Sequence, residues 1–154
     1  MFDYESAVKQ LQKDMGVDFV GLALPSNLKS EQDVTWKYVC GNLNERYKRI
    51  HLRRDSGVAG VVMKTGRKWI DRDISKTDVG EYTYKFPIIK FENLTSFLAE
   101  PLWKYNKVVA VLLFANRNHT PLTETIEADV EKLLETGFGP FYPEDVINFE
   151  NTKG

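Results

Sequence analysis

The chain has 154 residues, of which 42% are hydrophobic and 28% charged, and its net charge at pH 7 is −1. These values are typical of one globular domain, large enough to bury roughly 70% of the surface that its unfolded chain exposes. The nearly balanced charge excludes the basic face of a nucleic-acid-binding protein and the charge blocks of a disordered tail.

The N-terminus, the apolar runs and the cysteine content bear on location and chemistry. The first residues, MFDYESAVKQ, lack the regions of a signal peptide, and the longest apolar run, VVAVLLFA at 108–115, is too short to span a bilayer. We therefore expect a cytoplasmic protein. The single cysteine, Cys40, excludes an intramolecular disulfide and is expected to be a small apolar strand residue.

The N-terminal third predicts one helix and three strands. Residues 3–15 are amphipathic, with Asp3 as the N-cap and Gly16 as the terminating residue. β-branched and aromatic residues then predict strands, which polar turns connect. These strands are expected over 17–25, 34–41 and 46–54.

Alternation assigns the faces of the second and third strands. Trp36, Tyr38 and Cys40 are two residues apart and are expected to share one face. In the third strand, Ile50 and Leu52 are expected to share a face in the same way.

The middle of the chain opens with a short helix. Val58, Val61, Val62 and Thr65 follow the spacing i, i+3, i+4, i+7, which is typical of one helical face, and Gly66 is placed to end it.

An extended segment and a loop follow this helix. We expect extended backbone over 67–74 and a loop over 75–85 that covers a site and opens to admit a ligand. Pro87 suits the first position of a helix, which predicts a short helix from residue 87.

The C-terminal part predicts a hairpin and a last helix. Strands over 95–103 and 106–117 are joined by a tight turn at Tyr105 and Asn106. A helix is expected to open at Thr120–Pro121 and end at Gly137, with one apolar stripe. The stripe consists of Leu122, Ile126, Val130, Leu133 and Leu134.

This element order predicts an α+β domain. Short turns join the outer strands, so the sheet is expected to be antiparallel, with the terminal helices on one face and the middle segment on the other.

Two phrases at their places in this order resemble the GAF domain family. They are RRDSGVAGVVMKTGRKWIDRDI at 53–74 and TSFLAEPLWKYNKVVAVLLFANR at 95–117. The resemblance implies a single GAF domain over 1–137, with the ligand between the sheet and the middle helices. The tail, 138–154, is not assigned a structure.

Within the family, the sequence is most similar to stand-alone GAF nitrate receptors. That resemblance implies nitrate as the ligand, no catalysis, no cofactor, and a sensor histidine kinase of a two-component system for nitrate respiration as the partner. Other GAF subfamilies match less well. Methionine sulfoxide reductases use several cysteines, bilin-binding domains need a cysteine linkage, and cyclic-nucleotide domains carry an Asn-Lys-x-Phe-x-Asp-Glu pattern that is absent here.

Two alternatives stay open. One is a GAF regulator for another small ligand, such as a nucleotide or an organic acid. The other is a ligand-free interaction module that forms a homodimer through its terminal helices.

The residues themselves offer an anion site at a helix N-terminus. Such an end presents unpaired N–H groups and a partial positive charge of roughly +0.5, which favours an anion. One candidate begins at Ser56–Gly57 and offers the N–H groups of Val58, Ala59 and Gly60.

A second candidate N-terminus begins at Pro87 and offers the N–H groups of Ile88 and Ile89. If the fold brings both helices to the sheet, their N–H groups could converge on one small anion. Aromatic side chains from the second strand and the covering loop would form the walls: Trp36, Tyr84 and Phe86.

Backbone donors between apolar walls suit a weakly hydrated, singly charged anion, whereas phosphate or sulfate would usually recruit arginine or lysine. Arg53 and Arg54 are near in sequence and either turn inward or stay exposed on the sheet. Gly57 and Gly60 either serve the site or only allow close packing of the helix, and Trp36 either lines the site or fills the core.

No constellation predicts catalysis or a metal site. His51 and His119 lie outside any recognisable motif and are expected at the surface. Asp71 and Asp73 could present two carboxylates, but no further acidic or histidine cluster supports them.

Overall fold

An antiparallel sheet with helices on both faces forms the domain. The computed structural model describes residues 1–27 and 30–142, except for the side chains of 26, 27 and 30–32. The strands are β1 (Phe19–Asn27), β2 (Ser30–Cys40), β3 (Leu52–Arg53), β4 (Trp69–Asp71), β5 (Ser96–Lys104) and β6 (Lys107–Asn116). Their order in the sheet is β3-β2-β1-β6-β5-β4, and every neighbouring pair is antiparallel.

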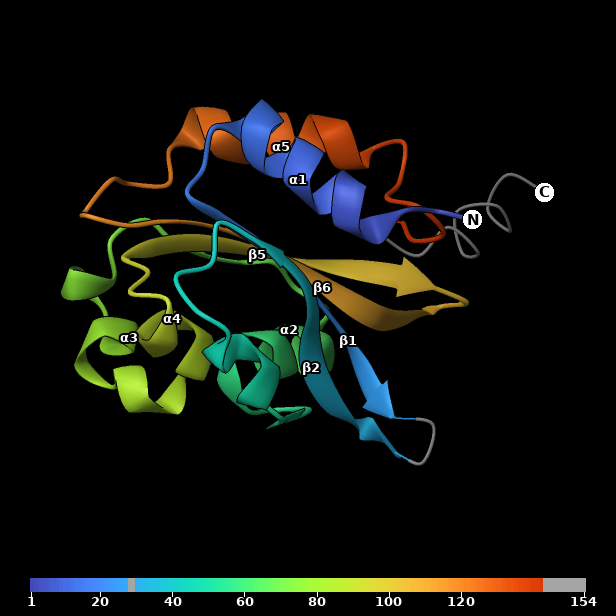
Figure 1. Cartoon of the computed structure of the whole chain (residues 1–154), viewed down its shortest axis with the longest axis horizontal. Helices are drawn as coiled ribbons and strands as arrows, with labels where there is room; N and C mark the ends of the chain where they lie inside the picture. Colours follow the sequence, from blue (N-terminus) through green and yellow to red (C-terminus); the bar gives the residue numbers. More distant parts are fainter. Residues whose placement is uncertain (28–29, 143–154) are drawn as a thin grey trace.

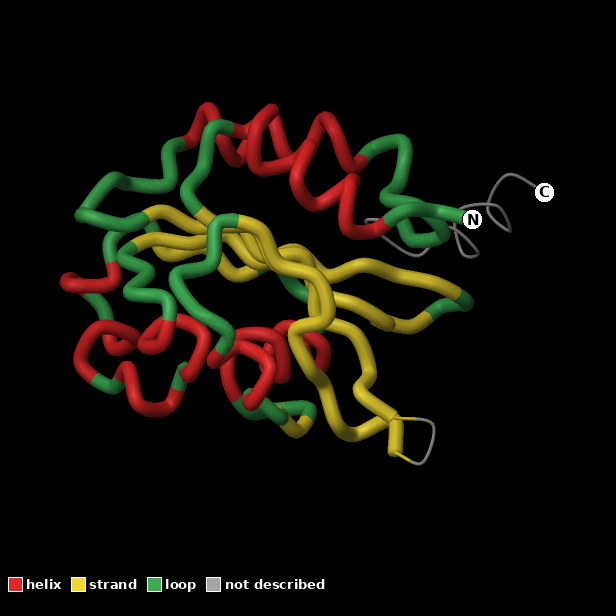
Figure 2. Tube along the Cα trace, viewed as in Figure 1, coloured by secondary structure: helices red, strands yellow, loops and turns green. Residues whose placement is uncertain are grey.

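Two terminal helices cover one face and the middle segment covers the other (Figure 1). The α-helices are α1 (Tyr4–Met15), α2 (Gly57–Thr65), α3 (Asp78–Glu81), α4 (Pro87–Phe91) and α5 (Glu124–Leu134). Three 3-10 turns complete the list: η1 (Arg46–Arg49), η2 (Ile74–Lys76) and η3 (Thr83–Lys85). Figure 2 shows the sheet between the two helical layers, which confirms the predicted α+β architecture.

The sheet separates two hydrophobic cores. The α2-side core lies between the sheet and the middle helices and includes Phe19, Trp36, Val58 and Ile88. The α1-side core lies under α1 and α5. Each core is formed by alternate side chains of the central strands β1, β5 and β6. Among the described residues, none of the helices has the length and hydropathy needed to cross a bilayer.

Local signals determine both ends of the first helix, as predicted. The side chain of Asp3 accepts a hydrogen bond from the Ser6 N–H at 3.0 Å, and Gly16 ends α1 with a φ of 64°. Val8 and Leu11 are the buried residues of this helix, and both belong to the α1-side core.

A β-bulge at Lys37 overturns the predicted face of β2. Leu22 of β1 pairs with Tyr38 and Ala23 pairs with Trp36, so one extra residue lies on β2 between them. The bulge turns Trp36 into the α2-side core, while Tyr38 packs against the α1-side core. Cys40 lies on the same side as Tyr38, and its thiol donates to Oε1 of Gln12 at 2.6 Å.

The hairpin turn between β1 and β2 is shorter than predicted, because β1 continues to Asn27 and β2 begins at Ser30. The remaining residues of that predicted turn, 28 and 29, lie outside the described residues.

The predicted strand over 46–54 is wrong for most of its length. Its first part is η1, closed by a hydrogen bond from the Ile50 N–H to the Tyr47 carbonyl at 3.1 Å. Tyr47 and Ile50 lie three residues apart and pack inward, which suits a 3-10 turn. Only Leu52 and Arg53 pair with β2. Ile50 and Leu52 are both buried, as the alternation predicted.

The buried face of α2 is also shifted from the predicted one. Val58 and Val62 are fully buried, but Val61 is half-buried and Thr65 is exposed. Ala59 and Met63 take their places, because α2 packs against the sheet on one side and against α4 on another.

The predicted loop over 75–85 is instead a series of short helical turns, η2, α3 and η3. The side chain of Asp73 caps η2 by accepting from the Ser75 N–H at 3.0 Å. Val79 is 4% exposed and packs into the α2-side core. Such short turns lack the periodic length that would have identified them in the sequence. Within the extended segment before them, β4 is limited to Trp69–Asp71.

The C-terminal hairpin agrees with its prediction, and the last helix begins later than expected. Tyr105 and Asn106 form the turn with φ values of 52° and 64°. The helix α5 begins at Glu124 rather than at Thr120–Pro121, because the Thr123 side chain caps the Ile126 N–H at 3.1 Å. It ends at Leu134, short of Gly137.

Residues 138–142, which the sequence does not assign, lie on the domain. Phe138 and Phe141 are buried in the α1-side core. Trp103 and Tyr142 exchange two backbone hydrogen bonds of 2.6 and 3.0 Å. The rest of the expected tail, 143–154, lies outside the described residues.

Candidate functional site

The N-terminus of α2 faces the sheet with no capping side chain from Ser56. Ser56 has extended backbone and makes no side-chain capping bond. Its N–H donates to the Arg53 carbonyl, and the Asp55 N–H donates to the Gly60 carbonyl, both at 3.0 Å. These bonds fold the preceding chain back against the helix, and the Ser56 side chain does not occupy the N–H groups that the first turn leaves unpaired.

The two glycines of α2 are required by close packing. A Cβ at Gly60 would lie 2.1 Å from the carbonyl oxygen of Arg53. Gly57 has a φ of 68°, and a Cβ there would lie 2.8 Å from the Leu52 side chain. Of the two interpretations that the sequence left open, the close packing of helix on strand accounts for both positions.

The second predicted N-terminus is also in place. Pro87 is the first residue of α4, and Ile88 and Ile89 are each 1% exposed. The Ile89 N–H donates to the Phe86 carbonyl at 3.0 Å. Since that donor is used within the first turn, Ile88 is the better placed of the two predicted donors.

Trp36 adds a buried donor that has no acceptor within the described part of the chain. Its side chain is 3% exposed, and its indole Nε1 is buried without a hydrogen-bond partner. Leaving such a group unpaired costs about 1–3 kcal/mol, and native proteins rarely do so. Trp36 belongs to the same core as Val58, Ala59 and Ile88. An acceptor bound in this core would satisfy the indole.

An aromatic wall borders this core on the side of β4. Phe86 packs against the core, and its ring lies 5.7 Å from the ring of Trp69, which in turn lies 5.4 Å from Phe97. Tyr84, by contrast, is 65% exposed and contacts the Tyr82 ring. Of the predicted site residues, Trp36, Val58, Ala59, Ile88 and Ile89 thus belong to the α2-side core and Phe86 packs against it, whereas Tyr84 lies outside it.

The two arginines next to α2 take different positions. Arg53 is exposed, and its backbone lies opposite Asp33 where β3 pairs with β2. Arg54 directs its guanidinium toward β6, where Nη2 lies 3.5 Å from the Val108 carbonyl oxygen. The donors that the sequence predicts for this core are neutral N–H groups, but two guanidinium groups lie at its margin: that of Arg54 at Val108, and that of Arg117 at 6.0 Å from the ring centre of Phe19.

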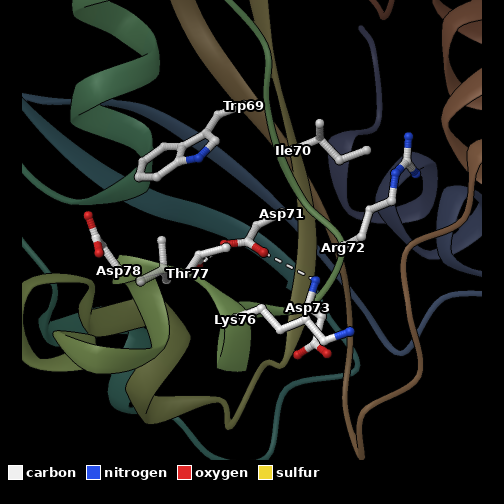
Figure 3. Close-up of a pocket in the computed structure, with 9 residues that line it drawn as sticks. Trp69, Ile70, Asp71, Arg72, Asp73, Lys76, Thr77 and Asp78 are labelled. Carbon is white, nitrogen blue, oxygen red and sulfur yellow. Dashed lines mark hydrogen bonds between the residues drawn. The ribbon is translucent and has the colours of Figure 1, made fainter.

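A separate cavity of about 560 Å³ lies beside β4 (Figure 3). Asp71 is 6% exposed there and accepts from the Asp73 N–H at 3.1 Å and from the Thr77 hydroxyl at 2.5 Å. Asp71 therefore fixes the turn that follows β4. Lys76 and Arg72 also line the cavity, so its charge is mixed.

A second opening, which the sequence reading missed, lies between β2 and η1. This cavity of about 310 Å³ is lined by Thr35, Trp36, Lys37, Tyr47, Lys48 and His51. The basic run RYKRIHLRR at 46–54 is the signal of this opening in the sequence, but its alternation favours a regular strand.

Comparison with known proteins relates this chain to solved structures alone, since no family model and no curated protein matches it. A hypothetical protein from S. aureus is 37% identical, with 79% of this chain and 98% of that chain covered and a TM-score of 0.75. NreA from Staphylococcus aureus, mutated in its nitrate binding site, is 37% identical over 79% of this chain and 88% of its own, with the same TM-score.

More distant structures share the fold. The GAF domain of an Acinetobacter phosphoenolpyruvate-protein phosphotransferase is 23% identical, with 84% of this chain and 73% of that chain covered and a TM-score of 0.63. A free methionine-R-sulfoxide reductase from Neisseria meningitidis is 16% identical, with 86% and 73% covered and a TM-score of 0.62. At these identities the likeness concerns the fold and not the activity.

Proposed function

This chain belongs to the GAF domain family, and from that premise we propose that it is a cytoplasmic nitrate receptor without enzymatic activity. Nitrate would bind in the α2-side core, between the sheet and the N-termini of α2 and α4. The similarity to NreA, which has a nitrate binding site, supports the choice of ligand.

The observation that carries the proposal is the unpartnered indole of Trp36. A buried N–H donor in the same core as the first residues of α2 and α4 needs an acceptor. Nitrate is planar, singly charged and purely an acceptor. We assign the N–H groups of Val58, Ala59 and Ile88, together with Nε1 of Trp36, as its donors.

The remaining predicted residues would shape the pocket. Phe86 and Pro87 would form its apolar wall at the start of α4. Gly60 and Ile89 would support it, since the first holds α2 against β3 and the second closes the first turn of α4. Tyr84 has no part in the proposed site.

The neutral donors explain the expected selectivity. Sulfate or phosphate would bring a second negative charge into this core, where the donors that we assign to the ligand are all neutral. Desolvating such an ion without a paired cation is costly. A weakly hydrated, singly charged ion loses less hydration free energy when it enters the core. The N–H donors of the site then replace its hydrogen bonds to water.

Isothermal titration with nitrate, chloride, sulfate and cyclic GMP tests the proposal. We expect one nitrate site that is selective over the other three ligands. Trp36→Phe should weaken nitrate binding about tenfold, or ~1.4 kcal/mol, because one hydrogen bond is lost. Trp103→Phe is the matched control, since Trp103 lies beside Gly66 at the margin of the same core.

Two results would contradict the proposal. Binding of cyclic GMP without nitrate heat would indicate a GAF regulator for another ligand. No response to any ligand, together with a dimer in solution, would favour the ligand-free interaction module.

We further propose that the receptor modulates a sensor histidine kinase of a two-component system for nitrate respiration. A ligand signals by favouring one of two conformations or assemblies. Kinase autophosphorylation should therefore differ between receptor alone and receptor with nitrate. Equal rates in both conditions would contradict this part of the proposal and leave nitrate binding intact.

A further inference from the structure

The edge of the sheet next to Trp36 is incomplete. β3 pairs with β2 only at Asp33 and Val34. Beyond Val34, the neighbour of β2 is the 3-10 turn η1 instead of a strand. A turn cannot continue the ladder of hydrogen bonds, so a gap remains at this edge.

This gap leads toward the proposed nitrate site. Of the six residues that line the opening of about 310 Å³, Trp36 belongs to the α2-side core and Tyr47 packs against it. Trp36 is therefore shared by the opening and the site. Trp36 is 3% exposed and belongs to both, so its side chain lies between the opening and the core.

The rim of the opening is cationic. Lys37, Lys48 and His51 line it and are exposed. The segment 46–54 carries five lysines and arginines and no acidic residue, in a chain whose net charge is −1. Glu45 is an acid near this rim, and it lies 3.4 Å from Lys48 in an exposed pair that solvent screens.

We propose that nitrate enters and leaves its site through this opening between β2 and η1, and that Lys37 and Lys48 steer the anion toward it. This inference rests on the proposed function. Fixed positive charges at the mouth of a cavity raise the local concentration of an anion and hence its association rate.

The segment over 75–86, where the sequence suggested an entrance, is packed against the domain. A Cβ at Gly80 would lie 2.1 Å from the Ile74 carbonyl oxygen, and Val79 is buried. Opening this segment would expose Val79 and separate those backbones. Entry through the gap beside β2 would move the buried Trp36 side chain but would not separate closely packed backbones.

Stopped-flow tryptophan fluorescence with sodium nitrate tests the route in the full chain. The double variant Lys37→Gln/Lys48→Gln should associate about fivefold more slowly at low ionic strength, since each charge contributes about twofold to threefold. The dissociation rate should stay the same. The difference should shrink as ionic strength rises to ~0.2 M, where the Debye length falls below 10 Å.

Two further variants separate the effect of charge on the association rate from the effect of where the entrance lies. Lys85→Gln removes the same charge from the 75–86 segment, where Lys85 lies over the Tyr82 ring, and should leave the association rate unchanged. His51→Trp places a larger side chain in the opening. It should slow association and dissociation by the same factor, so that the equilibrium affinity is preserved.

The outcomes distinguish the route from the function. If Lys85→Gln slows association and the double variant does not, the entrance lies at 75–86 and the proposal is overturned. Unchanged rates in the double variant and in His51→Trp, with normal nitrate affinity, would overturn the route while the receptor function stands. No fluorescence or heat signal in the unmodified protein would overturn both.

Discussion

Replacing Glu100 by glutamine should remove a pH dependence from the stability of this protein. Glu100 lies on β5, between Leu98 and Leu102 of the α1-side core, and is 7% exposed. Its Oε1 is buried without a hydrogen-bond partner. A carboxylate in such a place loses its hydration and gains little in return.

Burial raises the pKa of Glu100 from 4.5 to about 7. Lys68 opposes this shift by favouring the charged form, whereas Glu131 and Glu127 add to it. Lys68 itself is engaged by hydrogen bonds to both of these glutamates on α5. These two carboxylates largely neutralise the charge of Lys68, so Lys68 stabilises the charged form of Glu100 only weakly.

The sign of the effect follows from proton binding. Between pH 4.5 and 7 the folded state holds a proton on Glu100 that the unfolded state has lost, so stability falls as pH rises through this range. The rise in the pKa of Glu100 from 4.5 to about 7 corresponds to about 3 kcal/mol of stability, which is fully lost above the folded pKa. Below pH 4.5 the carboxyl is neutral in both states and the penalty is absent.

Urea unfolding from pH 5 to pH 8.5 measures this difference. Glu100→Gln should be more stable than the unmodified protein by about 1–3 kcal/mol at pH 8, and similar to it at pH 5. Glu135→Gln, at an exposed site after α5, is the matched control and should change neither value. Equal pH profiles for the unmodified protein and Glu100→Gln would refute the reasoning.

Three further substitutions test packing, ion pairing and turn geometry by urea unfolding. Gly60→Ala should cost about 1–3 kcal/mol, because the new methyl group would lie 2.1 Å from the Arg53 carbonyl oxygen; an unchanged midpoint would contradict the close packing. Arg117→Ala should cost about 3–5 kcal/mol, because it leaves the fully buried carboxylate of Glu92 without its cation at 2.7 Å. The double variant Arg117→Ala/Glu92→Gln should recover part of that stability. If the costs of the two single substitutions simply add, the two residues are not coupled. Tyr105→Asn should stabilise by about 0.5–1 kcal/mol, since asparagine tolerates the φ of 52° better than tyrosine; a lower midpoint would count against strain at the turn.

Elements with a local signal could be predicted from the sequence. The cap at Asp3, the C-terminal Gly16 and the proline at 87 each act within one helical turn, and α1 and α4 begin or end where they indicate. The turn at Tyr105 and Asn106 is local in the same sense. Such signals depend on a few neighbouring residues and not on the rest of the fold.

Features that depend on pairing with a neighbouring strand could not be predicted from the sequence. The bulge at Lys37 exists only in the pairing of β2 with β1, so perfect alternation of Trp36, Tyr38 and Cys40 misassigned two of the three side chains. The strand expected over 46–54 has its alternating pattern, but β2 offers pairing to only two of its residues.

The candidate site shows the same difference between local signals and features of the packed fold. Val58, Ala59 and Ile88 follow from the helix N-termini that are visible in the sequence, and all three belong to the same core as Trp36. Tyr84 was misplaced because its position depends on the unexpected turn η3. That the Trp36 indole has no acceptor is a property of the packed core and has no counterpart in the sequence pattern.

The extra residue in β2 determines which changes this chain can tolerate during evolution. Lys37 is exposed, so substitutions there leave the fold intact. Its deletion would restore strict alternation and turn the residues on one side of it to the opposite face of the sheet. Either Trp36 would leave the α2-side core, or Tyr38 would lose its stacking on Tyr4 of α1, where the rings lie 5.2 Å apart. In descendants of this chain we therefore expect the length of β2 to be conserved more strictly than the identity of the residue at the bulge.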